Sequence, residues 1–245
     1  MTAGSEATSK LELIMGREGL ERLAASTVMV LGLGGVGSNC VEALARGGVG
    51  RLIVVDHDVV QASNINRQAI AFHSTIGQKK TEVVRSMVAD INPEAQVTAH
   101  DTFVLAENLG ELMGMYRSQL DYVVDAIDTI STKLALAEWA DREGIQLISS
   151  MGAANKLYPE CFRIADVSKT VNCPLSRIMR KEARKRGIRH LRVLYSCEQP
   201  VKVPVREGAG RRERSNLGTA SFVPPIMGQM IAGEVIRTLA GVGRG

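Results

Sequence analysis

Short apolar runs rich in Val, Ile and Leu alternate along the first part of the chain with segments in which apolar residues recur at helical spacing. A strand buried on both faces reads as a continuous apolar run, and a helix that covers it reads as a one-sided apolar stripe. The alternation therefore predicts βαβ units around a parallel sheet. The expected strands are residues 27–31, 51–55, 96–99, 121–127, 145–149 and 192–195.

Helices are expected between these strands. One helix begins at the glycine-rich segment 32–38, and Pro225 opens an apolar stripe that runs to Leu239, because proline is tolerated in a first helical turn. The other expected helices are residues 11–23, 78–91, 133–142 and 176–186. Together these elements predict an α/β fold: a Rossmann-like, mostly parallel sheet over residues 1–155, and a less regular part of the same domain over residues 156–245.

The 245-residue chain has the composition of an ordinary globular domain, with 45% hydrophobic and 23% charged residues, 24 Gly and 7 Pro. This balance excludes disordered and collagen-like chains. The four cysteines form no Cys-x-x-Cys pair, so neither a zinc ribbon nor a disulfide framework is expected, and reduced thiols indicate a cytoplasmic protein. No run of about 18 uninterrupted apolar residues occurs, so no membrane span is expected.

Positive charge is concentrated in one segment. Residues 169–214 contain 14 Lys or Arg and 4 Asp or Glu, a local balance of +10, whereas the whole chain has a net charge of +4. The other residues therefore carry −6. A basic segment beside an acidic body is typical of a surface that binds a polyanion, although a charge run alone is more often a solvated helix. Within this region, residues 205–218 have almost no apolar content and are expected to form a mobile surface loop.

A Gly-x-Gly-x-x-Gly pattern, formed by Gly32, Gly34 and Gly37, lies between the first expected strand and the helix that follows it. Glycines in this context permit the tight turn and let a phosphate approach the N–H groups at the helix N-terminus. Asp56, 19 residues after Gly37 at the end of the second strand, is placed to accept hydrogen bonds from ribose hydroxyls. The pattern predicts nucleotide binding and does not by itself separate NAD from ATP.

The segment after Asp56 favours a triphosphate. It contains Asn64 and Arg67, and Lys80 follows downstream. An arginine and a lysine close to the glycine turn supply charge for a triphosphate, whereas the diphosphate of NAD is already bound by the turn. Each cation alone is more often an ordinary surface residue, but the pair beside a nucleotide-binding pattern favours ATP over NAD.

These motifs resemble the ubiquitin-activating-enzyme-like, adenylate-forming family, which includes the molybdopterin and thiamine adenylyltransferases. The resemblance rests on Gly32-Leu-Gly34-Gly35-Val-Gly37-Ser38, Asp56 with Asp58, Ser63-Asn64-Ile-Asn66-Arg67-Gln68, Lys80, and Asp125-Ala-Ile-Asp128. It implies that the glycines and the Ser63 motif form the ATP site, and that Asp56 holds the ribose. It further implies that Asn64 and Arg67 bind the phosphates and metal, that Lys80 binds the phosphates, and that Asp128 holds Mg²⁺ at the α-phosphate. Arg67, Lys80 and Asp128 are then the expected catalytic residues, with ATP and Mg²⁺ as cofactors.

The second part of the chain is similar to one subfamily. Gly152-Ala-Ala-Asn155-Lys156, Pro174-Leu-Ser-Arg177 and Ser221-Phe-Val-Pro224-Pro225 are among the segments that resemble the tRNA threonylcarbamoyladenosine dehydratases. The resemblance implies an ATP-dependent, ligase-type enzyme that cyclises N6-threonylcarbamoyladenosine in tRNA through an activated carboxylate. Catalysis would consist mainly of positioning and charge neutralisation by Mg²⁺, Arg67 and Lys80, without a protein nucleophile. An adenylyl and a phosphoryl intermediate both stay open.

The resemblance also implies partners. The basic segment 169–214 would contact the anticodon stem-loop of tRNA. A homodimer is expected from the family and from the apolar C-terminal helix, and a sulfur-transfer protein is a further expected partner. The chain departs from the usual pattern at Lys10, where the family has an Arg that reaches the nucleotide from the partner subunit, and at Cys173, where the subfamily commonly has Asp.

Two other functions stay open on the sequence alone. One is an adenylyltransferase that activates the C-terminus of a small ubiquitin-like sulfur carrier, although such activators usually have two Cys-x-x-Cys pairs. The other is a non-catalytic adaptor that binds nucleotide and RNA.

Cys40 is expected to be buried, and Cys161, Cys173 and Cys197 are candidates for reactive thiols, with a lowered pKa at Cys173 or Cys197 if exposed among the cations. The four histidines have no metal-ligand spacing and are expected to be structural or surface residues.

Overall fold

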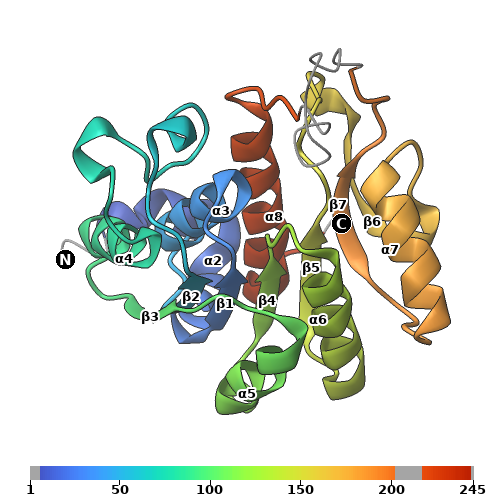
Figure 1. Ribbon diagram of the computed structural model, residues 1–245. Coiled ribbons are helices and arrows are strands. Elements are labelled where there is room, and N and C mark those ends of the chain that lie inside the picture. The colour runs from blue at the N-terminus through green and yellow to red at the C-terminus, as the bar shows by residue number, and fades with distance from the viewer. Residues whose placement is uncertain (1–5, 202–216, 244–245) are drawn as a thin grey trace.

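The structure is a computed structural model, and it describes residues 6–201 and 217–243. The mobile loop expected at residues 205–218 lies outside the described residues, except for Leu217 and Gly218. In Figure 1 the N-terminal half of the chain lies on the left, α7 lies at the right edge and α8 runs between the two halves.

A seven-stranded sheet forms the centre of the molecule, with the order β3-β2-β1-β4-β5-β7-β6. Neighbouring strands are parallel, except that β6 pairs with β7 in the antiparallel direction. The strands are β1 (Thr27–Leu31), β2 (Arg51–Asp56), β3 (Gln96–Asp101), β4 (Tyr122–Asp125), β5 (Gln146–Ser150), β6 (Phe162–Asp166) and β7 (Arg192–Ser196). The strand order reverses between β1 and β4, and α/β proteins bind ligands at the carboxyl ends of the strands at such a point.

Helices cover both faces of the sheet (Figure 1). On one face lie α2 (Ser9–Ala25), α3 (Gly35–Arg46), α4 (Lys80–Ile91) and α8 (Val223–Ala240), and on the other lie α5 (Ala106–Tyr116), α6 (Ile130–Glu143) and α7 (Pro174–Lys185). The C-terminal helix α8 packs mainly against α3 and α2. Helix α8 therefore packs against α3, the helix of the first βα unit.

The side chains of each strand alternate between two hydrophobic cores. In β1, Val28 and Val30 join the core under α3 and α8, whereas Met29 and Leu31 join the core under α5 and α6. Because both faces are covered, every residue of β1 is buried, which explains the continuous apolar run in the sequence. The pairing of β5 with β7 continues the sheet past residue 155, so the two expected parts of the chain share one sheet.

The predicted α/β class with a mostly parallel sheet is confirmed. Neither α5 nor β6 is anticipated from the sequence. Two glycines, Gly110 and Gly114, lie inside α5 and weaken its helical signal, since each lowers helix propensity by about 1 kcal/mol relative to alanine. β6 is an edge strand with a single fully buried residue, so it lacks a clear apolar alternation. The strand expected at 121–127 ends at Asp125. Among the described residues, no helix has the length and apolar character needed to cross a bilayer.

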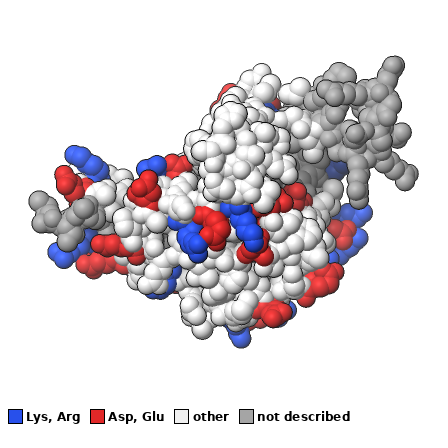
Figure 2. Space-filling model, turned by 60° about the vertical axis from the view of Figure 1, so that its left-hand side comes forward, with Lys and Arg blue, Asp and Glu red and all other residues white. Residues whose placement is uncertain are grey.

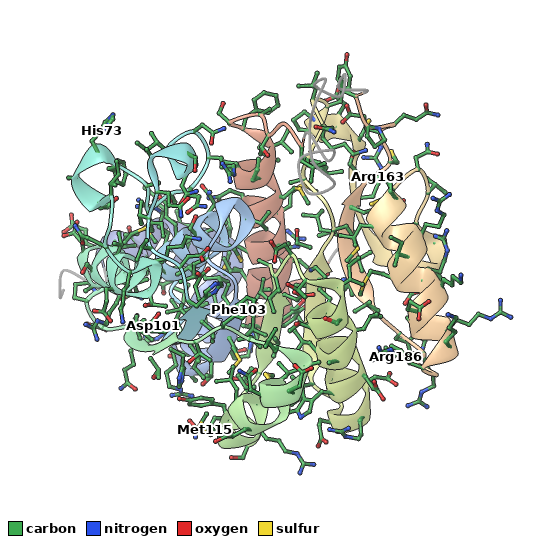
Figure 3. The ribbon with its side chains drawn as sticks, viewed as in Figure 1. His73, Asp101, Phe103, Met115, Arg163 and Arg186 are labelled. Atoms are coloured by element: carbon green, nitrogen blue, oxygen red, sulfur yellow. The ribbon has the colours of Figure 1, made fainter. Side chains whose placement is uncertain are left out.

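Helix α5 offers a test of the second core. Met113 is 0% exposed, whereas Met115 on the same helix is 54% exposed and lies at the lower edge of the molecule in Figure 3. We expect Met113→Ala to lower the free energy of unfolding by about 2–5 kcal/mol, because it removes buried methylene contacts and leaves a cavity. The matched control Met115→Ala should change it by less than about 0.5 kcal/mol. Urea unfolding of the two variants measures both values, and equal effects would contradict this packing.

Candidate functional site

One pocket of about 490 Å³ lies where β1, β2 and β4 end. Eight of the predicted site residues line it: Gly32, Gly34, Gly35, Asp56, Asn64, Arg67, Lys80 and Asp128. Gly37 and Ser63 do not line the pocket, but each contacts a residue that does: Gly37 packs against the Gly32 carbonyl group, and the Ser63 carbonyl oxygen accepts a hydrogen bond from Arg67. Residues that are 96 positions apart in the sequence thus meet in one cavity, because the carboxyl ends of parallel strands lie at the same edge of the sheet.

The glycine turn between β1 and α3 has two positions that only glycine can occupy. Gly32 has φ +88°, and a Cβ there would lie 2.7 Å from the carbonyl oxygen of Ala126. A Cβ at Gly37 would overlap the carbonyl oxygen of Gly32. Gly34 has open space at its Cβ position. The turn therefore presents bare backbone to the pocket at the N-terminus of α3, which is the arrangement that binds phosphates.

The carboxylate of Asp56 is held by the backbone. Its Oδ2 accepts a hydrogen bond from the Leu33 N–H at 2.6 Å, and its Oδ1 accepts one from the Asp58 N–H at 2.8 Å. The first bond joins the end of β2 to the glycine turn. Asp56 is therefore fixed beside that turn, at the place where the resemblance expects the ribose.

Lys80 is the first residue of α4, and its side chain is only 6% exposed. Its ammonium group donates a hydrogen bond to Asp58 Oδ2 at 2.7 Å and lies 3.8 Å from Asp56 Oδ1. The next residue toward the N-terminus, Lys79, is 56% exposed and pairs with Asp101 instead. One of two adjacent lysines thus lines the pocket among carboxylates, while the other lies outside it.

The Ser63–Gln68 motif folds back on itself beside the pocket. Arg67 Nη1 donates hydrogen bonds to the Ser63 carbonyl oxygen at 2.9 Å and to Asn66 Oδ1 at 2.8 Å. Asn64 Oδ1 accepts a hydrogen bond from the Gln61 N–H, which closes a short 3₁₀ turn. Asn66 Nδ2 also reaches the Thr219 carbonyl oxygen, just before α8. These bonds fix the orientation of the guanidinium group toward the cavity.

The turn that follows β4 also lines the pocket. Asp125, the last residue of β4, is fully buried, and its Oδ1 accepts a hydrogen bond from the Ile127 N–H at 3.1 Å. Asp128, three residues later, is exposed to the pocket, and its carboxylate accepts a long hydrogen bond from the Thr129 hydroxyl at 3.4 Å. Its carboxylate oxygens are therefore available to a cation, whereas those of Asp56 and Asp58 already have partners.

His57, Phe103 and Gln68 are among the pocket residues to which the sequence assigns no individual role. His57 is expected to be a structural or surface residue, yet it lines the cavity and its ring lies 4.2 Å from the ring of Phe103. Phe103 follows β3 (Figure 3). Gln68 is buried, and its Oε1 has no hydrogen-bond partner among the described residues. Its place at the end of the Ser63–Gln68 motif is a signal that could have included it.

A polar cluster in the second part of the chain fixes the loop after β5. Lys156 is buried, and its ammonium group donates a hydrogen bond to the Glu198 carbonyl oxygen. The Glu198 carboxylate accepts hydrogen bonds from the Leu157 and Tyr158 N–H groups at 3.0–3.1 Å. Burial lowers the pKa of Lys156, and the nearby Glu198 partly offsets this. The loop also meets residues 201 and 218 through backbone and side-chain bonds of Asn155.

The cysteines differ in accessibility. Cys40 is fully buried in α3, as expected, and burial raises the pKa of its thiol. Cys173 is also buried, so the exposure that would make it a candidate for a reactive thiol of lowered pKa is not met. It is the N-cap of α7, where its Sγ accepts a hydrogen bond from the Ser176 N–H at 3.5 Å. Cys161 and Cys197 are half-buried, and desolvation together with the neighbouring Cys197 raises the pKa of Cys161.

Helix α7 carries five of the nine described Lys and Arg residues of the basic segment 169–214. A shallow depression on it is lined entirely by cations: Arg177, Arg180, Lys181, Arg184 and Lys185. Arg180 donates hydrogen bonds to the carbonyl and hydroxyl oxygens of Thr170, and Lys185 forms an ion pair with Glu182. Arg186, at the lower end of the helix, is labelled in Figure 3. The face drawn in Figure 2 is different, because its basic and acidic side chains are interspersed. Residues 202–214, which hold further arginines of this segment, lie outside the described residues.

Comparisons with known proteins cover almost the whole chain. The model of the ThiF family matches residues 7–245. A tRNA threonylcarbamoyladenosine dehydratase of Bacillus subtilis is 43% identical over 240 residues, which are 94% of this chain and 93% of that protein. The crystal structure of the E. coli tRNA N6-threonylcarbamoyladenosine dehydratase TcdA in complex with ATP has a TM-score of 0.87 at 28% identity and covers 98% of this chain and 96% of that one. A SAMP-activating enzyme E1 of Haloferax volcanii is 36% identical over 156 residues, 61% of this chain and 56% of that protein.

Proposed function

The chain belongs to the ThiF family, and from this membership we propose that it is an ATP-dependent tRNA threonylcarbamoyladenosine dehydratase. The observation that carries the proposal is the single pocket in which the glycine turn, Arg67, Lys80 and Asp128 meet. The similarity to the Bacillus subtilis dehydratase extends over both parts of the chain, whereas the similarity to the Haloferax volcanii E1 enzyme covers 61% of it. This difference favours the dehydratase over a sulfur-carrier activator.

The reaction needs an activated carboxylate. The threonyl carboxylate of the modified adenosine is a poor acyl donor, because an oxide ion would have to leave from its carbonyl carbon. Transfer of an adenylyl or phosphoryl group from ATP to a carboxylate oxygen creates a better leaving group. A nucleophilic atom of the carbamoyl group then attacks the carbonyl carbon, loses its proton and expels AMP or phosphate, so that a ring closes with net loss of water. Whether AMP or ADP accumulates identifies the group transferred.

The residues of the pocket support this chemistry by charge and position. The N–H groups of the glycine turn and the Arg67 guanidinium group bind phosphate oxygens, and the Lys80 ammonium group neutralises charge that moves onto the leaving phosphate. Asp56 orients the ribose through the oxygens that its backbone bonds hold in place. None of these groups forms a covalent bond with the substrate, so their contribution is alignment and electrostatic stabilisation.

The donor set of the pocket fits a magnesium ion. Asp56, Asp58 and Asp128 outnumber the two cations Arg67 and Lys80, so the pocket already has excess negative charge before a polyphosphate enters. Asp56, His57 and Asp58 are close enough together to hold an ion, but Lys80 is bonded to this group, whereas the Asp128 carboxylate is accessible. We therefore assign the ion to Asp128, with the phosphates as its other oxygen ligands. When bound, Mg²⁺ neutralises phosphate charge at the reacting centre.

The function is tested by mass spectrometry of nucleosides from tRNA that carries threonylcarbamoyladenosine, after incubation with the chain with and without Mg-ATP. We expect an ATP-dependent loss of the mass of one water. Lys80→Ala should weaken ATP binding about 10- to 100-fold, because a charge-assisted hydrogen bond is lost and two carboxylates then face the phosphates uncompensated.

The matched control is Lys79→Ala, which removes an exposed ion pair from the adjacent position and should change ATP affinity less than about twofold. An unchanged nucleoside mass despite tight ATP binding would contradict the dehydratase. Pyrophosphate exchange that depends on a small sulfur-carrier protein would then support the activator instead.

Helix α7 is proposed to bind the phosphates of the tRNA anticodon stem-loop. Within the described residues, Arg177, Lys181 and Arg184 form no ion pair with a carboxylate, so their charges are available to a polyanion. Since the substrate is tRNA, we place the enzyme in the cytoplasm. A sulfur-transfer partner protein, which the family resemblance implies, stays a prediction.

The triple variant Arg177→Ala/Lys181→Ala/Arg184→Ala should bind tRNA more weakly and with a smaller salt dependence. Each lost phosphate contact reduces the slope of log K against log salt by about 0.7–0.9, so we expect a decrease of about 2. The control Arg46→Ala/Arg85→Ala/Arg117→Ala removes three exposed arginines from other helices and should leave the slope unchanged. Filter-binding titrations at several salt concentrations measure it, and equal slopes for both variants would contradict this interface.

A homodimer is the further assembly that we propose. A large hollow between β6 and α8 is lined by apolar residues such as Ile226 and Met230 and also by charged ones, Arg163, Arg192, Glu234 and Arg237. On α2, Leu13 and Ile14 are both more than 70% exposed. A second copy of the chain would cover these surfaces and bring Lys10 toward the neighbouring pocket. We expect a dimer at micromolar concentration by sedimentation equilibrium, and a monomer for Ile226→Asp/Met230→Asp, because two apolar contacts are replaced by carboxylates that must lose their hydration on association. A monomeric wild-type chain would contradict the assembly.

A further inference from the structure

Lys133 lies in the first turn of α6 and is 1% exposed, although its side chain is charged. Its ammonium group donates hydrogen bonds to Asp125 Oδ2 at 2.9 Å, to the Ser150 carbonyl oxygen at 2.8 Å and to the Ser149 hydroxyl at 3.3 Å. An ammonium group has three donors, and all three are used. Lys133 therefore connects the end of β4 to the end of β5.

On the β4 side, this contact extends to the nucleotide pocket. The Asp125 carboxylate holds Lys133 and the Ser149 hydroxyl with Oδ2, and with Oδ1 it accepts the Ile127 N–H of the turn that ends at Asp128. Lys133 thus orients the carboxylate that orients this turn. It does not line the pocket and touches no residue that we assign to ATP.

On the β5 side, the contact extends to the loop that precedes Lys156. The Ser150 carbonyl oxygen, which Lys133 binds, is the last carbonyl of β5, and the chain continues from it to Asn155. Asn155 in turn exchanges hydrogen bonds with Gly218 and accepts one from the Val201 N–H, so this loop is bonded to residues 201 and 218. One ammonium group therefore sets the spacing between the turn at Asp128 and the loop of the second part of the chain.

Local structure gives no reason for a lysine at this position. The N-terminal turn of a helix has a positive electrostatic potential, so it favours acidic residues and disfavours cations. A buried ion pair is also no more stable than a well-packed apolar pair of similar volume. We therefore attribute a geometric contribution to Lys133. A buried ion pair with all its hydrogen bonds formed permits a single arrangement of the ends of β4 and β5.

We propose that Lys133 is a positioning residue for the cyclisation: it fixes the distance between the turn that carries Asp128 and the loop after β5, and thereby aligns activated phosphate and tRNA substrate. This inference rests on the proposed function. A misplacement of reacting groups by about 1 Å is enough to reduce a rate about 100-fold. Since Arg67, Lys80 and the glycine turn hold ATP without contact to Lys133, the nucleotide affinity should be unaffected.

The test is steady-state dehydration of threonylcarbamoyladenosine-containing tRNA by the full chain, with ATP affinity measured by calorimetry on the same samples. We expect Lys133→Met to reduce kcat about 100-fold while the dissociation constant for ATP stays within about threefold. Because Lys133→Met leaves Asp125 buried without a cation, the neutral double variant Asp125→Asn/Lys133→Met is measured in parallel, with folding of each verified by circular dichroism and thermal unfolding. The amide that replaces the carboxylate keeps an acceptor for the Ile127 N–H, so the double variant is the better folded of the two.

Arg117→Met is the control: it removes an exposed arginine away from the pocket, and its partner Glu143 keeps the ion pair with Arg142, so kcat should stay at the wild-type value. The inference is overturned if the folded double variant retains kcat within about threefold of wild type, or if kcat and ATP affinity fall together in proportion to the folded fraction. A wild-type chain that binds ATP but never dehydrates tRNA overturns the proposed function first, and the inference with it. Dehydration of tRNA by the wild-type chain therefore distinguishes failure of the proposed function from failure of the positioning role of Lys133.

Discussion

The close approach of two backbone turns determines where the pocket forms. Gly32 has no side chain, and this lets the turn after β1 pack directly against Ala126 in the turn after β4. Any other residue at position 32 would separate the two turns and would also have to adopt a left-handed conformation. Because the turns touch, the phosphate-binding N–H groups of α3 and the carboxylate of Asp128 line the same cavity. The remaining site residues are arranged around this contact.

The two cations of the pocket have partners of different charge. Lys80 is almost completely withdrawn from solvent, and such a cation is stable there because Asp56 and Asp58 lie beside it. Arg67 is held by a carbonyl and an amide oxygen, so it remains free to exchange these neutral partners for phosphate. The two cations therefore differ in function, since one is neutralised by the protein and the other is not.

Much of the architecture follows from sequence periodicity. The buried strands β1, β2 and β4 and the helices that cover them are visible as apolar runs and stripes, and the glycine turn and Asp56 fall where such a fold places a nucleotide. The resemblance to the ubiquitin-activating-enzyme-like family and the α/β class are confirmed. The structure brings the predicted site residues together in one pocket, and their individual roles stay predictions.

What the sequence could not show are interactions between distant segments. Lys133 appears as one cation in a helix, and its partners Asp125 and Ser150 are recognisable only after β4 and β5 are paired. His57 and Phe103 come from two different strand ends and become neighbours through the pairing of β2 with β3. In β6, the weak alternation of an edge strand conceals the pairing with β7.

The thiol that caps α7 changes the electrostatic field of the basic surface. A carboxylate at position 173, as in the subfamily that the chain resembles, would cancel the partial positive charge of about half a unit at the start of a helix. Cys173 supplies only a weak neutral acceptor, so that half charge persists and one full negative charge is absent. The start of α7 is then more attractive to a polyanion approaching from solution. A neutral cap thus leaves the positive potential at this end of α7 undiminished, and salt screens that potential least at low ionic strength.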